Sequence, residues 1–415
     1  MNKQSTSQKA SLTSRTFHSG FRKALFASVF SLLIGLVLGF IIMLIVSFTN
    51  ADAHPWEGLL VLFAGPFSAL RPVNALGNMI FYTVPLIFTG LSVAIAYKTG
   101  LFNIGAAGQF IIGTLVSLEI ALNINSIGKP TQAIFVWLLA VVAGCLGGIL
   151  WGLIPGALKA FFGINEVIIC IMTNWIAANL ATWVFSSQVH LSNIEGGKSG
   201  YLITTSSTGN STPAGGLGKL TGNSYLDISI IIAIVIAILI WLLLNKTTLG
   251  YSMKACGMNK YSAKYAGIND KLNIMISMGL AGGLAALGGV FYYLNPGIEL
   301  QFKSIYQNLP SYGFDGISAA FLANISPLAV IFSSLLIRYL SAAGSNLTSA
   351  GYNSYFADII IASIIYLAGF SRIFQEMIPN IVKTAKASKA KAYHKALTEG
   401  LDETLEENEV FGGNE

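Results

Sequence analysis

The sequence predicts an all-α protein, a polytopic bundle of membrane helices with about ten transmembrane crossings. Hydrophobic residues make up 54% of the chain and charged residues only 10%, whereas soluble chains carry about 25% charged residues. So few charged side chains do not cover a surface that faces water, and the lipid bilayer is therefore the expected solvent. Apolar runs of about 20 residues, the length that crosses a bilayer as a helix, also recur along the chain.

The first apolar run, Ala24–Phe48, is too long for the core of a signal peptide, and no cleavage site of small residues follows it. We expect it to remain as a membrane span. A short interfacial helix over Trp56–Phe63 is expected next, with Trp56 as its anchor. Asn324 and Pro327 divide a later run into two short crossings, and Lys159 marks a loop after the fourth crossing. Crossings two to ten are predicted at about 75–97, 104–122, 132–154, 166–186, 225–244, 273–294, 313–323, 327–343 and 355–370.

Positive charge orients this bundle, because loops rich in Lys and Arg stay in the cytoplasm. Residues 1–23 are basic and contain no acid, so they form a predicted cytoplasmic tail. The transmembrane domain covers 24–372, and 373–415 form a second cytoplasmic tail. The polar loop 187–224 has few positive charges and is expected outside. Between Lys246 and Lys271 there are five Lys and one acid, which indicates an inner loop and agrees with the count of crossings.

The sequence offers no set of residues for catalysis. The three cysteines form no CxxC pair, the histidines are scattered, and no metal-ligand spacing occurs. EGGKSG at 195–200 resembles the end of a phosphate loop, but Ser192 stands where that motif requires Gly. We therefore expect no enzyme activity, no metal, no cofactor and no nucleic-acid partner on this chain.

Two segments are weakly alike. LFNIGAAGQ follows the second crossing and YGFDGISAAF follows the seventh, each with an aromatic residue, then Asn or Asp, then Gly and small residues. The two crossings run in opposite directions in the predicted topology. This pattern is typical of an inverted repeat, a design in which the transport site lies near the repeat interface.

The segment KACGMNKYSAKYAGIND, at 254–270, is polar and basic between two apolar runs. Asn259 is a helix-capping residue type, and Gly267 suits a left-handed helix end. About two turns of helix between them would expose Tyr261, Tyr265 and lysines. Such a helix is either a docking element or an ordinary basic loop that contacts lipid head groups.

This segment resembles the cytoplasmic coupling segment of permease subunits of ABC importers. Within these importers the chain resembles the nucleoside-uptake branch, which is related to the ribose and branched-chain amino acid permeases. The likeness covers about 75–370, and Ala107 stands where the family pattern usually has Glu. Three further segments carry it: NMIFYTVPLIFTGLSVAIAYKTGLFNIGAAGQF at 78–110, NEVIICIMTNWIAANL at 165–180 and YGFDGISAAFLANISPLAV at 312–330.

The resemblance implies a multi-pass protein of the bacterial cell membrane, with both termini in the cytoplasm. It implies three partners: a cytoplasmic ATPase that holds ATP and Mg, a second permease subunit that is often a different chain, and an extracellular binding lipoprotein. The residues that would contact the ATPase are Asn259, Lys260, Tyr261, Lys264, Tyr265 and Gly267.

Polar and aromatic residues inside the predicted crossings are candidates for the substrate path: Phe102, Asn103, Gln109, Asn174, Trp175, Phe314 and Asp315. Each has an alternative interpretation. Asn103 and Asp315 are also possible helix caps. Gln109 and Asn174 suit hydrogen bonds between helices. The aromatic side chains either stack on a nucleobase or simply pack.

Three further residues have two interpretations each. Asn165 and Glu166 begin the fifth crossing, where they either cap the helix or take part in gating. Arg338 lies in an apolar run and either snorkels outward or pairs with Asp358.

The leading hypothesis is thus a nucleoside permease driven by ATP hydrolysis on a partner chain, coupled through 254–270. One alternative is the same machine carrying a simple sugar or another small solute. A second is an ion-coupled secondary transporter, which would need more acids inside its crossings than this chain has.

Overall fold

The computed structural model contains seven helices long and apolar enough to cross a membrane among the residues it describes. The predicted tails, the start of the first span and part of the 187–224 loop lie outside these residues. The chain divides into two units, Val37–Ile365, which contains the helical bundle, and a second formed by Met1–Leu36 with Tyr366–Glu415. The described residues are 34–50, 52–186, 202–203, 205, 208–301, 305, 307–353 and 355–369.

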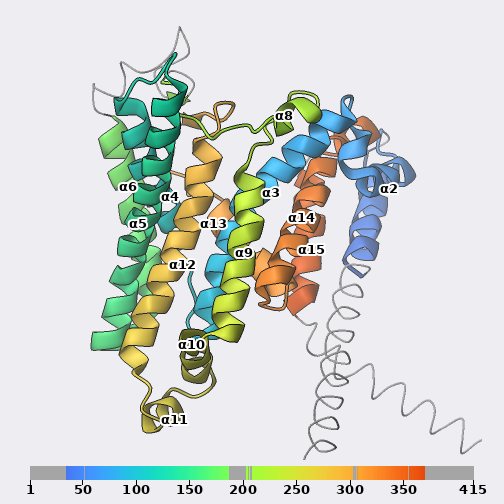
Figure 1. Ribbon diagram of the computed structural model, residues 1–415. Coiled ribbons are helices and arrows are strands. Elements are labelled where there is room, and N and C mark those ends of the chain that lie inside the picture. Colours follow the sequence, from blue (N-terminus) through green and yellow to red (C-terminus); the bar gives the residue numbers. More distant parts are fainter. Residues whose placement is uncertain are drawn as a thin grey trace, which may run out of the picture. The chain divides into compact units, whose positions relative to one another are not determined.

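Each predicted crossing falls on one helix, so the all-α membrane fold is confirmed (Figure 1). The first is Ile34–Ser47. The helices at the other predicted crossings are α3 (Pro72–Lys98), α4 (Ala106–Asn123), α5 (Pro130–Phe162), α6 (Glu166–Phe185), α9 (Ser229–Lys246), α12 (Asp270–Tyr293), α13 (Tyr312–Leu322), α14 (Pro327–Gly344) and α15 (Tyr355–Gly369). Ile34–Ser47, α13 and α15 are shorter than the seven that are long enough to span. Shorter elements connect them: α2 (Pro55–Ala64), η1 (Gly65–Ser68), β1 (Leu202–Ile203), α8 (Leu217–Leu220), α10 (Thr248–Met258), α11 (Lys260–Tyr265), β2 (Leu300–Gln301) and η4 (Leu347–Ala350).

The structure tests the predicted helix before the second crossing and the predicted loop after the fourth. The predicted short helix over Trp56–Phe63 is α2, and the Trp56 side chain is 70% exposed. The predicted loop at Lys159 is wrong, because α5 continues to Phe162. The Lys159 ammonium lies 2.8 Å from the Glu166 carboxylate at the start of α6, so the charge is balanced without ending the helix.

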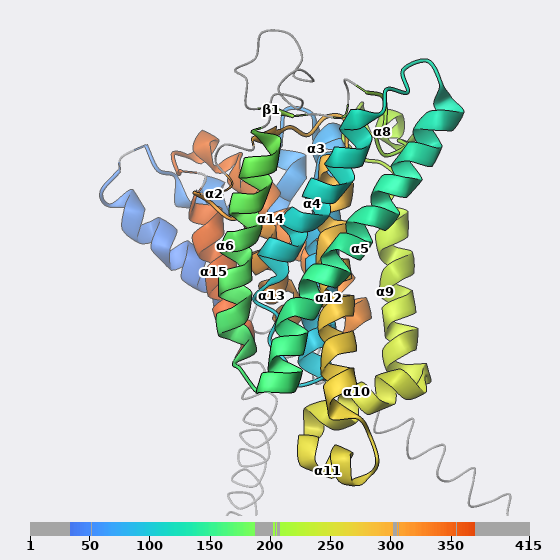
Figure 2. The same cartoon turned by 90° about the vertical axis from the view of Figure 1, so that its left-hand side faces the viewer.

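Helices α3, α4 and α12 form the centre of the bundle, and α5, α6 and α9 lie outside them (Figure 2). In an apolar 18-residue stretch of each central helix, 78–89% of the residues are buried, whereas in the outer three helices the share is 22–39%. Small residues permit the closest approach: a Cβ added at Gly148 of α5 would overlap Ala286 of α12. Packing through small residues replaces the hydrophobic effect between helices in lipid.

Residues 208–228 form an ordered cap over the ends of α3, α4 and α12. Asn210 donates to the Ala121 carbonyl of α4 (2.8 Å), and the Tyr225 amide donates to Asn78 of α3 (2.9 Å). Asp227 is 2% exposed and accepts from Asn295, just after α12 (2.8 Å). Figure 1 shows this cap, with α8, at the end of the bundle opposite α10 and α11.

Candidate functional site

The polar segment between α9 and α12 folds as the sequence predicts. The Asn259 side chain accepts from the Ser262 amide (3.0 Å) and begins α11, and Gly267 adopts φ +79° just after it. Asn269 then caps α12 by accepting from the Leu272 amide (3.1 Å). Both the predicted cap and the predicted helix end are confirmed.

This segment presents aromatic and basic side chains away from the bundle. Met258, Tyr261 and Tyr265 are 88%, 78% and 95% exposed, and Lys264 is exposed beside them. We call these four residues the α11 surface. Lys260 differs from them, because its ammonium pairs with the Asp270 carboxylate (3.2 Å) and so ties α11 to the start of α12.

Gly257 seats the segment against the turn between α3 and α4. A Cβ added at Gly257 would overlap the Lys98 carbonyl oxygen, and Gly100 lies directly opposite with φ +78°. Only glycine permits so close a backbone approach. Ser252 of α10 also donates to Asn273 of α12 (2.7 Å). These contacts join α10 to the α3–α4 turn and to α12.

The same turn leads into a buried polar network. Asn103 donates to Gln109 (2.7 Å) and to Ser92 of α3 (2.9 Å), while Gln109 donates back to Asn103 (3.2 Å). Asn174 of α6 accepts from the Gly108 amide (2.8 Å) and donates to the Ile104 carbonyl (3.0 Å). Asn174 thus makes the predicted inter-helix hydrogen bond, from α6 to α4, whereas Gln109 bonds to Asn103 in the turn before its own helix. The cap interpretation of Asn103 is wrong, since Gly105 occupies that position of α4.

The remaining predicted path residues lie apart from this network. Phe102 packs near Phe321 of α13, with ring centroids 6.2 Å apart. Trp175 is 43% exposed on the outer face of α6, and Phe314 is 38% exposed on α13. Asn165 caps α6 by accepting from the Val167 amide (2.9 Å), so its cap interpretation is confirmed; the gating role of Glu166 remains a prediction.

A partly exposed charged pair joins α13 and α14. The Arg338 guanidinium of α14 is 3.5 Å from the Asp315 carboxylate of α13, and its Cζ lies 4.5 Å from the centre of the Tyr312 ring. The predicted pairing of Arg338 with Asp358 is therefore wrong, because the turn between α13 and α14 brings Asp315 closer. Asp315 does not cap α13 either, since Ser311 holds that position.

Sequence reasoning missed the aromatic cluster that surrounds this pair. The centre of the Tyr312 ring lies 4.9 Å from that of Tyr292 in α12 and 5.9 Å from that of Phe110 in α4. The ring centres of Tyr292 and Tyr82, in α3, are 6.2 Å apart. These residues are far apart in the sequence, so no local pattern reveals them. The exception is the Tyr292–Tyr293 pair at the end of an apolar run, because two adjacent tyrosines there indicate an aromatic cluster.

The starts of α4 and α13, the two segments of the weak repeat, touch each other. A Cβ added at Gly313 would overlap Ala107, which is fully buried. The contact requires glycine at 313, because an added Cβ there would meet the backbone of Ala107. The inverted repeat itself remains a prediction.

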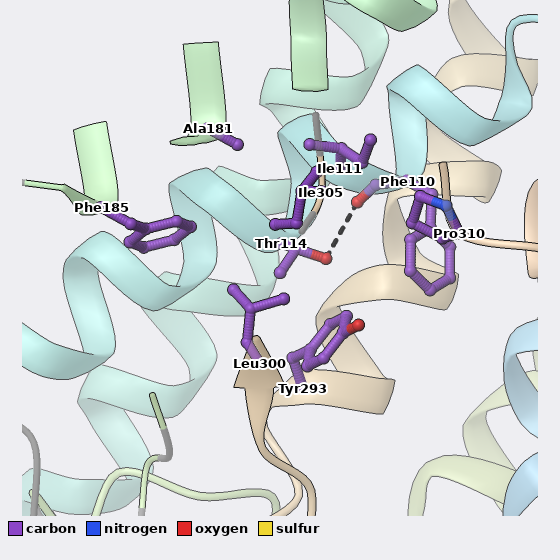
Figure 3. A pocket seen from close by; sticks show the side chains of 9 residues that line it. All are labelled: Phe110, Ile111, Thr114, Ala181, Phe185, Tyr293, Leu300, Ile305 and Pro310. Carbon is purple, nitrogen blue, oxygen red and sulfur yellow. Dashed lines mark hydrogen bonds between the residues drawn. The ribbon is translucent and has the colours of Figure 1, made fainter. Parts of the chain in front are cut away.

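Beside the aromatic cluster lies a small cavity. Its lining is almost entirely apolar and comes from α4, α6, α12 and the segment before α13 (Figure 3). The Thr114 hydroxyl in its wall already donates to the Phe110 carbonyl (3.0 Å), as the dashed line in Figure 3 shows. Small-molecule sites need several converging polar groups, and this cavity offers too few for a polar solute. Among the described residues no group of His, Cys, Asp and Glu is arranged to hold a metal ion.

Comparison with known proteins identifies the class. Residues 75–369 match the family of branched-chain amino acid transport system permease components. The match covers most of the chain, so the protein belongs to this permease family and is a multi-pass membrane protein.

The most similar relatives that we compared are permeases of ABC transporters. The chain is 34% identical to the nucleoside ABC transporter permease protein NupB of Lactococcus lactis, over 87% of this chain and 94% of that protein. It is 32% identical to the guanosine ABC transporter permease protein NupP of Bacillus subtilis, over 84% and 93%. A more distant relative is the glucose ABC transporter permease protein TsgB13 of Haloferax volcanii, 26% identical over 80% and 84%. No solved structure matches the chain.

Proposed function

We propose that this permease carries nucleosides into the cell, driven by ATP hydrolysis on a separate cytoplasmic subunit. The observation that supports it best is the likeness to two permeases named for nucleosides and guanosine, at 34% and 32% identity over more than nine tenths of their length. The exposed α11 surface offers a place where such a cytoplasmic subunit would bind.

In this proposal the α11 surface binds the ATPase. Its exposed tyrosines, Tyr261 and Tyr265, supply large contact areas with little loss of side-chain entropy. Closure of the ATPase pair pushes α10 and α11, and Gly257 passes the movement to the α3–α4 turn. The buried Asn103 network links that turn to α6 and α12, so the bundle moves as packed units rather than by bending single helices.

The remaining partners follow from this assignment. The α11 end of the bundle faces the cytoplasm, and the cap formed by 208–228 faces outward, where a binding lipoprotein delivers the solute. A second permease subunit completes the path.

Uptake of labelled guanosine by cells that express this chain with its ATPase, partner permease and binding protein tests the proposal. We expect uptake that stops when ATP is depleted but persists when the proton and sodium gradients are collapsed. Uptake that instead requires an ion gradient would contradict the ATP-driven mechanism. Uptake of glucose or galactose, without uptake of guanosine, would contradict the nucleoside cargo but not the ATP-driven mechanism.

A further inference from the structure

The faces of the outer helices differ in polarity. Between Ile134 and Phe161 of α5 every exposed side chain is apolar, and the same holds for α9 between Ile231 and Leu242. On α6 the exposed Asn179 amide donates to the carbonyl of its own helix at Trp175 (2.9 Å). These three helices therefore present lipid-facing surfaces.

Helices α13 and α14 also expose apolar side chains (Phe314, Phe332 and Leu335), but they carry a partly exposed charged pair as well. The Asp315 side chain is 40% exposed although its partner, Arg338, is only 16% exposed. Arg338 lies about 16 Å along the roughly 27 Å of α14 at 1.5 Å per residue, so the pair lies near the middle of this crossing. A charged side chain at that depth is costly in lipid and faces a water-filled space or a polar partner.

The pair is also incompletely bonded. The Nε and Nη2 atoms of Arg338 are buried and make no hydrogen bond within the described part of the chain. The 3.5 Å separation from Asp315 is long for a charge-assisted hydrogen bond. Arg338 also faces the Tyr312 ring, which fixes its position by a cation–π contact. The arrangement holds the Asp315 carboxylate in place. The carboxylate also accepts a hydrogen bond from Ser311, and its two oxygens have further lone pairs for another donor.

We propose that Asp315, held by Arg338, is a specificity-determining residue on the transport path that accepts hydrogen bonds from the vicinal hydroxyls of a solute. A carboxylate has two adjacent acceptor oxygens, and the 2′- and 3′-hydroxyls of ribose are two adjacent donors. Phe314, the preceding residue of α13, is an aromatic residue that is 38% exposed. The assignment to ribose depends on the proposed nucleoside cargo, whereas the recognition of a vicinal diol does not.

The test compares uptake of guanosine with uptake of 2′,3′-dideoxyguanosine by the complete importer. The ratio of the two initial rates does not depend on how much transporter is inserted, and the same binding protein serves every variant. We expect the Asp315→Asn variant to lower this ratio about tenfold, the equivalent of about 1.4 kcal/mol. Asp315→Glu, which keeps the charge but moves it, should lower it less. Glu57→Gln makes the same chemical change on the exposed face of α2 and should leave the ratio unchanged.

A ratio that is equal in the wild type and in both Asp315 variants would overturn the proposal. The proposal also fails if Asp315→Asn leaves the ratio unchanged but prevents co-purification of the partner permease, since Asp315 would then face that subunit. If the wild type carries no nucleoside, the proposed cargo fails separately. The ratio is then measured with galactose and 2-deoxygalactose, where the same loss of discrimination is expected.

Discussion

Asn103 shows how single polar residues shape this protein. It is fully buried and joins Gln109 and Ser92 by hydrogen bonds of 2.7 and 2.9 Å. Because buried donors without partners cost about 1–3 kcal/mol each, the network fixes one arrangement of the α3–α4 turn.

Replacing Asn103 by Leu should lower the free energy of unfolding by about 1–3 kcal/mol, because Gln109 loses its buried partner. Thermal unfolding of the purified protein in detergent measures it as a fall in Tm. Asn179→Leu is the matched control, since among the described residues the Asn179 amide bonds only to its own helix. A fall in Tm of equal size in both variants would contradict the assigned role of the network.

Asp227, in the cap formed by 208–228, makes the stability of the fold depend on pH. Burial raises the pKa of this carboxyl above its ordinary value of 3.8, although hydrogen bonds from Ser229 and Asn295 oppose the shift. The folded protein therefore holds the proton more tightly than the unfolded chain, and the free energy of unfolding falls as the pH rises from about 3.8 through the raised pKa.

Thermal unfolding of wild type and Asp227→Asn across pH 4 to 8 checks the sign. The Tm of wild type minus that of the variant should decrease as the pH rises. A difference that grows with pH would mean that the carboxylate is better stabilised in the folded state than in water.

At the scale of elements, α10 contacts the bundle through its backbone. Gly257 places the backbone of α10 against Lys98 and Gly100, whereas most other glycines with close neighbours lie between the membrane helices. The contact is backbone against backbone, so no side chain is able to move aside.

Gly257→Ala should therefore reduce ATP-driven uptake several-fold while the ATPase remains bound through the α11 surface. Gly279→Ala in α12 is the control, because its added methyl group would first meet the end of the Leu153 side chain, at 3.2 Å. Uptake and co-purification of the ATPase are measured together. Full uptake by Gly257→Ala would exclude this contact from coupling.

The whole molecule has a predicted orientation. Leu220 in the cap is 78% exposed, and Tyr265 on α11 is 95% exposed at the opposite end (Figure 1). A membrane-impermeant thiol reagent should label Leu220→Cys in intact cells and Tyr265→Cys only after permeabilisation. The native cysteines 145, 170 and 256 are buried or half-buried and provide a low background. The reverse labelling pattern would invert the assigned topology.

Local sequence signals predicted the parts of the fold that depend on local chemistry. Apolar length located the crossings, and Asn259 and Gly267 gave the limits of α11 because caps and left-handed turns are properties of single residues. The length of α5 was missed, since its Lys159 is balanced by Glu166 beyond the helix end. The partner of Arg338 was missed because only the folded α13–α14 hairpin shows that Asp315 is nearer than Asp358.

In the proposed mechanism, ATP hydrolysis on a partner drives transport through the α11 surface. Guanosine uptake into proteoliposomes that contain the purified importer and binding protein, with ATP on the side of the ATPase, tests this coupling. Tyr261→Ala/Tyr265→Ala is compared with Tyr355→Ala, the same chemical change at a tyrosine that is 69% exposed on α15. We predict that the double variant loses both uptake and ATPase association, whereas Tyr355→Ala retains both. Uptake by the double variant at the wild-type rate, or uptake without ATP, would contradict this mechanism.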